Sequence, residues 1–547
     1  MKTRKLFVLP AICCALALTL GVYGEEKQEN AKAKAEANTE ADAKAKAEAE
    51  EKAKLIFSKD GKTITGVKDK GIKSVVIPNG VTSIGRWAFS SCSSLTSITI
   101  PDSVTSIGGG AFYSCDNLTS ITIGNGVTSI GDGAFRGCSN LTSLTIPDSV
   151  TSIGKEAFFG CKSLTSITIP DSVTSIGKGA FAWCSKPTSV VIPDSVTSIG
   201  DYAFSWCFSL KRLTIGNSVT SIGKEAFFGC KSLTSITIPD SVTSIGDLAF
   251  SGVQSVQVST KNHVFSVDGS GVLINKKEKK LLYAPRSLSG NYTIPDSVTS
   301  IGNSAFSNCS NLTSITIPDS VTSIGKEAFY DCYNLTSVTI GNGVTSIGER
   351  AFSGCFSLTS LTIPDSVTSI GGSAFWNCSS LKSITIDNGV TSIGKGAFAW
   401  CSKLTSVVIP DSVKSIGAEA FCNCKLLTSV TIGNGVTSIG ERAFLGCSSL
   451  TSITIPDSVT SIGDSAFRGC KNLTSITIPD SVTSIGGSAF YSCSNLVVVT
   501  VGKGVTSIGT CAFTNCSSLK RLTIPAKFTD EDVKKWDVPS KCKVIRR

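Results

Sequence analysis

CSNLTSLTIPDSVTSIGKEAFFG, residues 138–160, is one unit of a pattern that repeats along most of the chain. Its central motif, V-T-S-I-G with Lys for Thr in one copy, occurs eighteen times. The copies follow one another at a constant 23-residue step from Val81 to Val242 and again from Val298 to Val505. A repeat of this length predicts a solenoid, in which each unit stacks on its neighbours, rather than a globular domain.

Each unit predicts two short strands and a closing turn. In L-T-S-I-T-I, residues 118–123, alternation places Ile121 and Ile123 inside and the intervening Ser and Thr outside. V-T-S-I-G predicts a second extended stretch, and A-F-x-x-C is expected to form one turn of α- or 3₁₀-helix. One unit buries about six large apolar side chains, worth roughly 9–18 kcal/mol. That gain does not offset an ordering cost of about 1–2 kcal/mol per residue, so the units are stable only as an array.

Phenylalanine and cysteine recur at fixed positions of the unit. Of 22 cysteines, 17 occupy the same repeat position, and the chain has a single histidine. A disulfide ladder and metal binding are alternatives for this column, but zinc fits poorly without a C-x-x-C pair. We favour small buried hydrophobes, with no metal and no cofactor. The predicted core ladder is represented by Phe112, Phe135, Phe158, Cys115, Cys138 and Cys161.

Apart from Cys13 and Cys14 in the N-terminal apolar run, three cysteines and one coil depart from this column. Cys422 and Cys511 replace variable residues and could pair with neighbours, and Cys542 lies in the C-terminal tail. Near residues 249–256 the C-x-x of the unit is missing, and we expect Val253 to take the place of the repeat's leucine.

The motif I-P-D-S-V-T-S-I-G-x-x-A-F-x-x-C-x-x-L resembles the BspA-type, or treponemal-type, leucine-rich repeats of surface proteins. The general leucine-rich-repeat signature L-x-x-L-x-L is met here as L-T-S-I-T-I, and the resemblance covers about residues 72–525. It implies a right-handed, β-rich superhelix that is secreted or exposed at the surface. It also implies adhesion to host matrix proteins or to other cells.

The organisation of the chain follows from where the repeats start, stop and are interrupted. The first residues resemble a signal peptide, with a retained membrane anchor as the alternative, and no later segment is apolar enough to span a bilayer. The interruption contains β-prone runs and turn residues and predicts a small β-meander. The predicted parts are a signal peptide (1–24), a charged Ala/Glu/Lys-rich spacer (25–54), an N-terminal hairpin cap and first strand (55–80), the first repeat block (81–250), an irregular β insertion (251–292), the second repeat block (293–525) and a C-terminal cap (526–547).

The candidate binding residues lie where the units differ. The two positions after V-T-S-I-G and the two after A-F vary freely, and several of them are aromatic. We expect them on the convex side, where recurring aromatics suit protein or glycan contact; drift, with rings folded onto neighbouring coils, is the alternative. This predicted ridge comprises Trp87, Tyr113, Trp183, Trp206, Tyr330, Trp376 and Trp400.

Other candidate chemistry is weaker. The single histidine, His263, lies in the insertion and is expected to be an exposed loop residue rather than part of a catalytic group. One aspartate per unit is too sparse for calcium. A Ser/Thr column along the strands is either a ligand-binding ladder or a solvated face. The net charge of +10 is not accompanied by a recognisable nucleic-acid-binding motif, so we expect no nucleic-acid partner.

These patterns predict a non-enzymatic, adhesin-like binding protein, secreted or displayed at the cell surface or outer envelope. Its partners would be protein or glycan ligands on host or neighbouring cells, engaged by many repeated contacts along a monomeric rod. The alternative is a structural spacer or periplasmic scaffold that has no host ligand.

Overall fold

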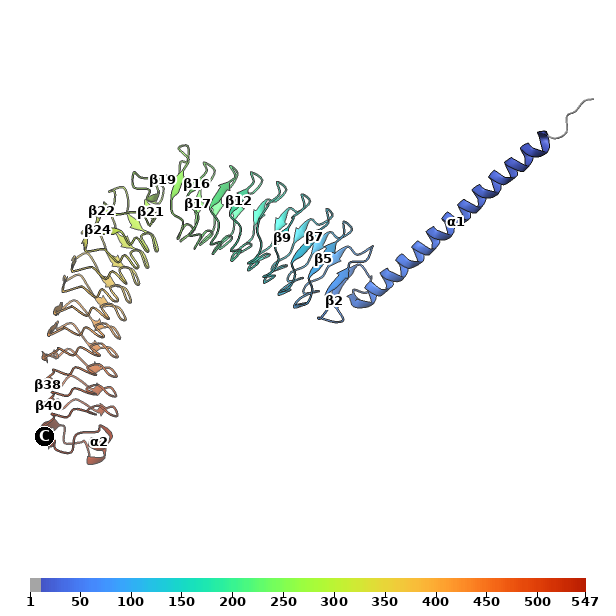
Figure 1. Ribbon diagram of the computed structural model, residues 1–547. Coiled ribbons are helices and arrows are strands. Elements are labelled where there is room, and N and C mark those ends of the chain that lie inside the picture. The colour runs from blue at the N-terminus through green and yellow to red at the C-terminus, as the bar shows by residue number, and fades with distance from the viewer. Residues whose placement is uncertain (1–10) are drawn as a thin grey trace, which may run out of the picture.

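The computed structural model describes residues 11–547 and shows an elongated β-solenoid that follows a long helix, α1 (Ala11–Lys54) (Figure 1). The solenoid consists of two blocks that run in different directions and meet near the insertion. The prediction of a β-rich solenoid with 23-residue coils is confirmed, because successive strands pair in parallel at a 23-residue offset, as in Ser152 with Ser175. The expected signal peptide falls partly on residues 1–10, which lie outside the described residues.

One side of the solenoid is a parallel sheet of two-residue strands, each formed by the Ser-Ile of one V-T-S-I-G motif. We call these two-residue strands the dyad strands and the sheet that they form the dyad ladder. In each step the Ile side chains face the core, and the Ser residues of adjacent coils lie opposite one another. The dyad strands of the first block are β4 (Ser83–Ile84), β6 (Ser106–Ile107), β8 (Ser129–Ile130), β10 (Ser152–Ile153), β11 (Ser175–Ile176), β13 (Ser198–Ile199), β15 (Ser221–Ile222) and β17 (Ser244–Ile245). Those of the second block are β23 (Ser300–Ile301), β25 (Ser323–Ile324), β27 (Ser346–Ile347), β29 (Ser369–Ile370), β31 (Ser392–Ile393), β33 (Ser415–Ile416), β35 (Ser438–Ile439), β37 (Ser461–Ile462), β39 (Ser484–Ile485) and β41 (Ser507–Ile508).

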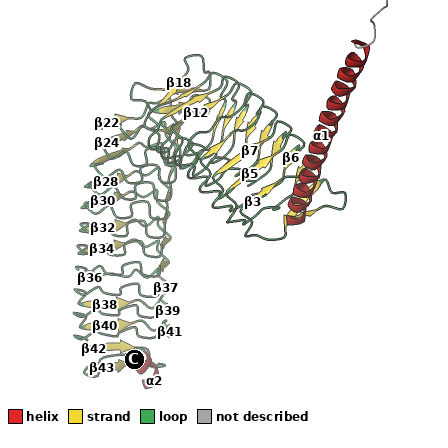
Figure 2. Cartoon of the chain, turned by 45° about the vertical axis from the view of Figure 1, so that its right-hand side comes forward, coloured by secondary structure: helices red, strands yellow, loops and turns green. Residues whose placement is uncertain are grey.

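A second face carries the strands of the L-T-S-I-T-I segments (Figure 2). Their burial alternates between exposed Ser or Thr and buried Ile, as the sequence pattern predicts. In the first block these strands are β3 (Ser74–Val76), β5 (Ser97–Ile100), β7 (Ser120–Ile123), β9 (Ser143–Leu144), β12 (Ser189–Ile192), β14 (Arg212–Ile215), β16 (Ile236–Ile238) and β18 (Val256–Val258). In the second they are β22 (Gly290–Thr293), β24 (Leu312–Ile317), β26 (Ser337–Ile340), β28 (Ser360–Ile363), β30 (Ser383–Ile386), β32 (Ser406–Ile409), β34 (Ser429–Ile432), β36 (Ser452–Ile453), β38 (Ser475–Ile478), β40 (Val498–Val501) and β42 (Arg521–Ile524).

The A-F turn, which closes each coil from the Gly of V-T-S-I-G to the Cys, is a run of turns. In the coil that contains Phe112, the N–H groups of Ala111 and Cys115 bond to carbonyls three residues back, whereas those of Gly110 and Phe112 cross to the next coil. The alternation requires left-handed backbone at some positions, as at Gly110 with φ 63°. The expected helical turn is therefore wrong, because a helix directs its N–H groups along its own axis and would not link the coils.

The interior is filled by continuous columns of one residue type. Phe112, Phe135 and Phe158 are fully buried and stack nearly parallel, with ring centroids 5.2 and 5.3 Å apart. The cysteines beside them are also fully buried. Offset stacks of this kind are worth about 0.5–1.5 kcal/mol per pair beyond area burial. The identical side chains of adjacent coils thus seal the faces that a single coil would expose.

The insertion forms an antiparallel meander of β19 (Phe265–Val267), β20 (Leu273–Asn275) and β21 (Lys280–Tyr283). Strand β21 then pairs in parallel with β23, the first dyad of the second block, whereas the dyad ladder of the first block ends at β17. Leu273 and Tyr283 pack into the core of the first block, and Ile274 and Leu281 into that of the second. The meander is therefore a plate with one block packed on each face.

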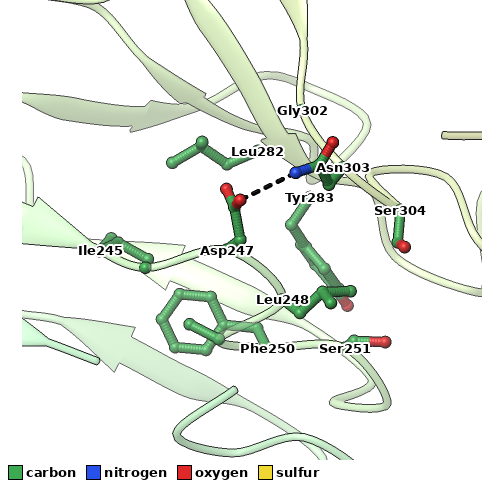
Figure 3. A pocket seen from close by; sticks show the side chains of 12 residues that line it. Ile245, Asp247, Leu248, Phe250, Ser251, Leu282, Tyr283, Gly302, Asn303 and Ser304 are labelled. Atoms are coloured by element: carbon green, nitrogen blue, oxygen red, sulfur yellow. Dashed lines mark hydrogen bonds between the residues drawn. The ribbon is translucent and has the colours of Figure 1, made fainter. Parts of the chain in front are cut away.

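The polar contact across this junction centres on Asp247. Its carboxylate accepts a 2.9 Å hydrogen bond from the Asn303 amide and forms an ion pair with Lys280 at 3.4 Å. Figure 3 shows this carboxylate facing Asn303 beside a small hollow, with Phe250 and Tyr283 nearby. Asp247 thus ties the last coil of the first block to the first coil of the second.

The coil before the junction contains the expected deletion. Ile236 of β16 pairs with Val256 of β18, an offset of 20 residues instead of 23. The N–H of Gln254 bonds to the carbonyl of Leu233, and Val253 is fully buried. The prediction that C-x-x is missing and that Val253 replaces the leucine is confirmed.

Both ends of the solenoid are covered. The hairpin of β1 (Leu55–Phe57) and β2 (Thr63–Val67) extends the dyad ladder, and the N–H of Val76 at the edge of β3 donates to Glu51 of α1. At the other end, β43 (Lys543–Arg546) pairs with β42, and α2 (Asp530–Lys535) leads to the buried Trp536. The indole N–H of Trp536 donates to the carbonyl of Ile508 at 3.0 Å. These elements satisfy sheet edges that would otherwise pair with another chain.

Candidate binding surface

The seven predicted ridge residues all lie in A-F turns, but in two backbone settings. Trp87, Trp183, Trp206 and Trp400 have left-handed backbone, with φ between 60° and 66°. Tyr113, Tyr330 and Trp376 directly follow the core Phe and are not among the left-handed residues. We call these seven residues the aromatic ridge.

Left-handed backbone is unfavourable for a large side chain. At the repeat position shared by Trp183, Trp206 and Trp400, glycine occurs in other coils with the same sign of φ, namely Gly137, Gly160, Gly229, Gly354, Gly446 and Gly469. A residue with a Cβ pays about 1–2 kcal/mol for this conformation. Small polar residues also stand at this position with left-handed backbone, as at Ser91, Asn308 and Asp331, so the conformation belongs to the repeat and a tryptophan there is a bulky exception with a cost in stability.

In the first block the ridge gathers into an aromatic cluster. Trp183 and Trp206 stack with centroids 5.3 Å apart, and both contact Phe208. Phe228 meets Trp206 edge to face at 5.0 Å. The sequence analysis did not single out Phe208 and Phe228. The 23-residue repeat was the available signal, because it places Phe228 in the coil next to Trp206. Trp183 remains 37% exposed, so the cluster presents an apolar surface to solvent.

A second, smaller pair lies at the start of the same block. Trp87 meets Tyr113 edge to face, with centroids 5.4 Å apart. The guanidinium of Arg86 lies 5.8 Å from the Trp87 ring centroid, within the range of a cation–π contact. Trp87 is 46% exposed.

In the second block Tyr330 and Trp376 line one hollow together with Arg350, Ser353 and Ser373. Tyr330, Ser353 and Trp376 are equivalent residues of three successive coils, so a small side chain separates two aromatic ones. The sequence identified the two aromatics but missed the arginine and the serines, because polar residues at variable positions are common along the chain. Trp400 lies in the next coil and is 44% exposed.

The cysteine column consists of buried thiols that form no disulfide bonds. The cysteines from Cys92 to Cys542 are unpaired thiols, and the 17 column members are buried. Burial raises the pKa of Cys184 and Cys401 to about 12, so both stay protonated at neutral pH. Cys422 is buried, Cys511 is exposed, and neither forms the disulfide that was considered for it.

Many threonine hydroxyls along the stack hydrogen-bond to the backbone of the preceding coil. The hydroxyls of Thr105 and Thr119 donate to main-chain oxygens of the preceding coil at 3.1 and 3.0 Å, and the pattern repeats along the stack. The outward Ser and Thr of the strands, such as Ser360 and Thr362, instead line a shallow polar hollow. Within these columns the outward hydroxyls are the ones that face solvent.

Candidate catalytic and metal-binding groups are few among the described residues. No group of three or more His, Cys, Asp or Glu side chains between residues 11 and 547 is arranged to hold a metal ion. His263 is exposed in the insertion. Its neighbour Asn262 is buried and uses its amide to hold the backbone of Pro239 and Val242.

Among the described residues, no helix is both long and apolar enough to cross a membrane.

The fold and the ridge define a leucine-rich-repeat solenoid with a variable aromatic surface. The family model for the BspA type leucine rich repeat region matches in six copies, over residues 67–188, 174–270, 285–404, 322–450 and 414–533. The chain therefore belongs to the BspA-type leucine-rich-repeat family. No curated protein matches the sequence.

Solved structures of bacterial leucine-rich-repeat proteins are similar to this one. A leucine rich cell surface protein from Faecalibacterium prausnitzii is 33% identical, with a TM-score of 0.51, over 69% of this chain and 92% of that one. A leucine-rich repeat protein from Bacteroides ovatus is 26% identical, with a TM-score of 0.32, over 90% and 97% of the two chains. The T. pallidum leucine rich repeat protein is 34% identical, with a TM-score of 0.30, over 33% and 86%.

Proposed function

We propose that this protein is a non-enzymatic, adhesin-like binding protein, secreted or displayed at the cell surface, that holds protein or glycan ligands of host or neighbouring cells through its aromatic ridge. The observation that carries the proposal is the recurrence of exposed tryptophans at variable positions of the A-F turns. Exposed aromatic side chains that recur on one surface are typical of sites that contact another molecule. Trp183, Trp376 and Trp400 remain more than one third exposed, so core packing does not account for them.

The spacing of the ridge favours many weak contacts over one strong one. Aromatic groups lie near Trp87, near Trp206, and between Tyr330 and Trp400, separated by several coils and, between the two blocks, by the meander. Linked sites on one scaffold gain avidity even when each binds weakly. The similar protein from Faecalibacterium prausnitzii is described as a cell surface protein, which supports the proposed location.

Binding of the full-length protein to host cells and to immobilised matrix proteins tests this proposal. Replacing Trp87, Trp183, Trp206, Trp376 and Trp400 together by Ser should abolish saturable binding without unfolding the solenoid. A matched control replaces exposed strand-face residues, Val191 and Val408, by Thr, which stands at the same position in most other coils. If the wild type shows no saturable binding at micromolar concentration, or if protease cannot reach the repeats on intact cells, a spacer or periplasmic scaffold is the better account.

A further inference from the structure

The hollow between Tyr330 and Trp376 is a slot formed by the repeat itself. The core rings just before these residues, Phe329, Phe352 and Phe375, have centroid steps of 4.9 and 5.4 Å. The backbones that carry Tyr330 and Trp376 are thus about 10 Å apart, two coil spacings. Ser353 lies between them, and no other place in the second block has a small residue flanked by aromatics in this column.

The base of the slot carries an unpartnered polar group. Ser353 is only 2% exposed, and within the described chain its hydroxyl makes no hydrogen bond, although it lines the hollow. The equivalent Ser205 in the first block, also buried, donates its hydroxyl to the carbonyl of Phe228 at 3.4 Å. Among the described residues the fully buried hydroxyls without a partner are those of Ser195, Ser366 and Thr514, so the Ser353 hydroxyl reaches the hollow and is open to a ligand hydroxyl.

The side of the slot carries a guanidinium whose charge is already balanced. Arg350 lies 3.5 Å from Glu327 and 3.9 Å from Glu349, and Glu349 also pairs with Lys326. Both contacts of Arg350 are longer than a hydrogen bond, so its N–H donors remain available to a neutral acceptor. The two carboxylates offset the two cations, which disfavours an anionic ligand.

We infer that this slot binds one neutral hexopyranose unit of a glycan; the inference rests on the proposed function and assigns a ligand class to one part of the ridge. The apolar C–H faces of the sugar pack against the rings of Tyr330 and Trp376, whose faces carry partial negative charge. Contact distances of about 3.5–4.0 Å on each side fit one ring within the spacing of about 10 Å. The hydroxyls of the sugar bond to Ser353, to Ser373 and to the planar fork of Arg350.

The volume of the hollow fits one sugar ring. The hollow measures about 290 Å³, at the small end of the roughly 300–1,000 Å³ typical of small-molecule sites. It is open to solvent on the ridge, so a longer glycan could extend from the bound unit along the solenoid.

Saturation-transfer-difference NMR on the full-length protein tests the inference with methyl α-mannoside, methyl β-glucoside and methyl β-galactoside as probes. We expect at least one of them to bind with a dissociation constant on the order of 1 mM, as for a small polar ligand. The variant S353Y fills the slot with a residue that the same column already holds at Tyr113 and Tyr330, and it should weaken binding about tenfold or more. W376A removes one wall and should do the same.

The matched control is L445Y, which places the same side chain in the same column four coils away and should bind as the wild type does. Circular dichroism and urea midpoints verify that all variants are folded. Unchanged binding in S353Y and W376A would overturn the site, as would preference for sialyllactose over lactose. If none of the three glycosides binds at tens of millimolar while cell binding persists, the sugar site is wrong and the proposed function stands.

Discussion

The thiol of Cys161 donates a hydrogen bond to the main-chain oxygen of Phe135 in the preceding coil, with a sulfur–oxygen distance of 3.3 Å. The same oxygen already accepts the N–H of Cys138 within its own coil, so the thiol uses its second lone pair. The contact recurs along the column, for example from Cys355 to Phe329 and from Cys470 to Phe444. The repeat thus selects cysteine as a small buried side chain that also links coils.

Replacing Cys161 by Ala should lower the free energy of unfolding by about 1–3 kcal/mol, from the lost hydrogen bond and the small cavity left behind. Urea denaturation followed by circular dichroism measures the change. Cys161→Ser retains a donor of similar size and should lose less. Equal losses in the two variants would show that the hydrogen bond does not explain the choice of cysteine.

Stability should fall steeply at alkaline pH. An unfolded thiol has a pKa of about 8.5, whereas burial raises the folded values to about 12 for Cys184, Cys230 and Cys401. Because the folded pKa is the higher one, the contribution is fully present below pH about 8.5 and is lost as pH rises toward 12, by about 1.4 kcal/mol per pH unit for each thiol.

Urea midpoints between pH 7 and 10.5 test this dependence. The midpoint should be level up to about pH 8 and fall above pH 9. Ellman's reagent provides the control: at pH 8 the native column thiols should be unreactive, while the exposed Cys511 reacts. Rapid reaction of most thiols in the native protein would contradict the burial on which the prediction rests.

The junction between the blocks should loosen when Asp247 is replaced by Ala. The change removes the acceptor of the Asn303 amide and the partner of Lys280, while the apolar plate of the meander stays intact. We expect circular dichroism to be unchanged, small-angle scattering to show a broader distribution of overall dimensions, and proteolysis to be faster within residues 251–292. Asp201→Ala is the control, because that carboxylate only accepts the Lys224 N–H inside a block; equal effects would locate the loss outside the junction.

The repeat made most of the fold predictable, since one 23-residue pattern determines strand positions, register and the inward columns. The turn at A-F-x-x-C was mispredicted because its conformation depends on hydrogen bonds to the next coil, as at Phe112, and not on local propensity. The candidate site was only half predictable. Tyr330 and Trp376 are conspicuous in the sequence, but Ser353 becomes informative only when stacking places it between them.

The last prediction separates ligand binding from folding at Trp400. This residue has φ 66° and is 44% exposed, and glycine occupies its position at Gly354 and Gly446. Trp400→Gly should therefore raise the free energy of unfolding by about 1 kcal/mol, because it relieves the left-handed strain.

Under the proposed function the same variant should bind its cellular ligand more weakly, so stability and binding should change in opposite directions. Urea midpoints and cell-binding titrations measure the two quantities, and Trp376→Ser, at a position without left-handed backbone, is the control that should lose binding without gaining stability. If Trp400→Gly is more stable and binds equally well, tryptophan at this position has no role in recognition. If it is less stable, packing of the Trp400 ring on the solenoid outweighs the left-handed strain, which contradicts the predicted gain in stability.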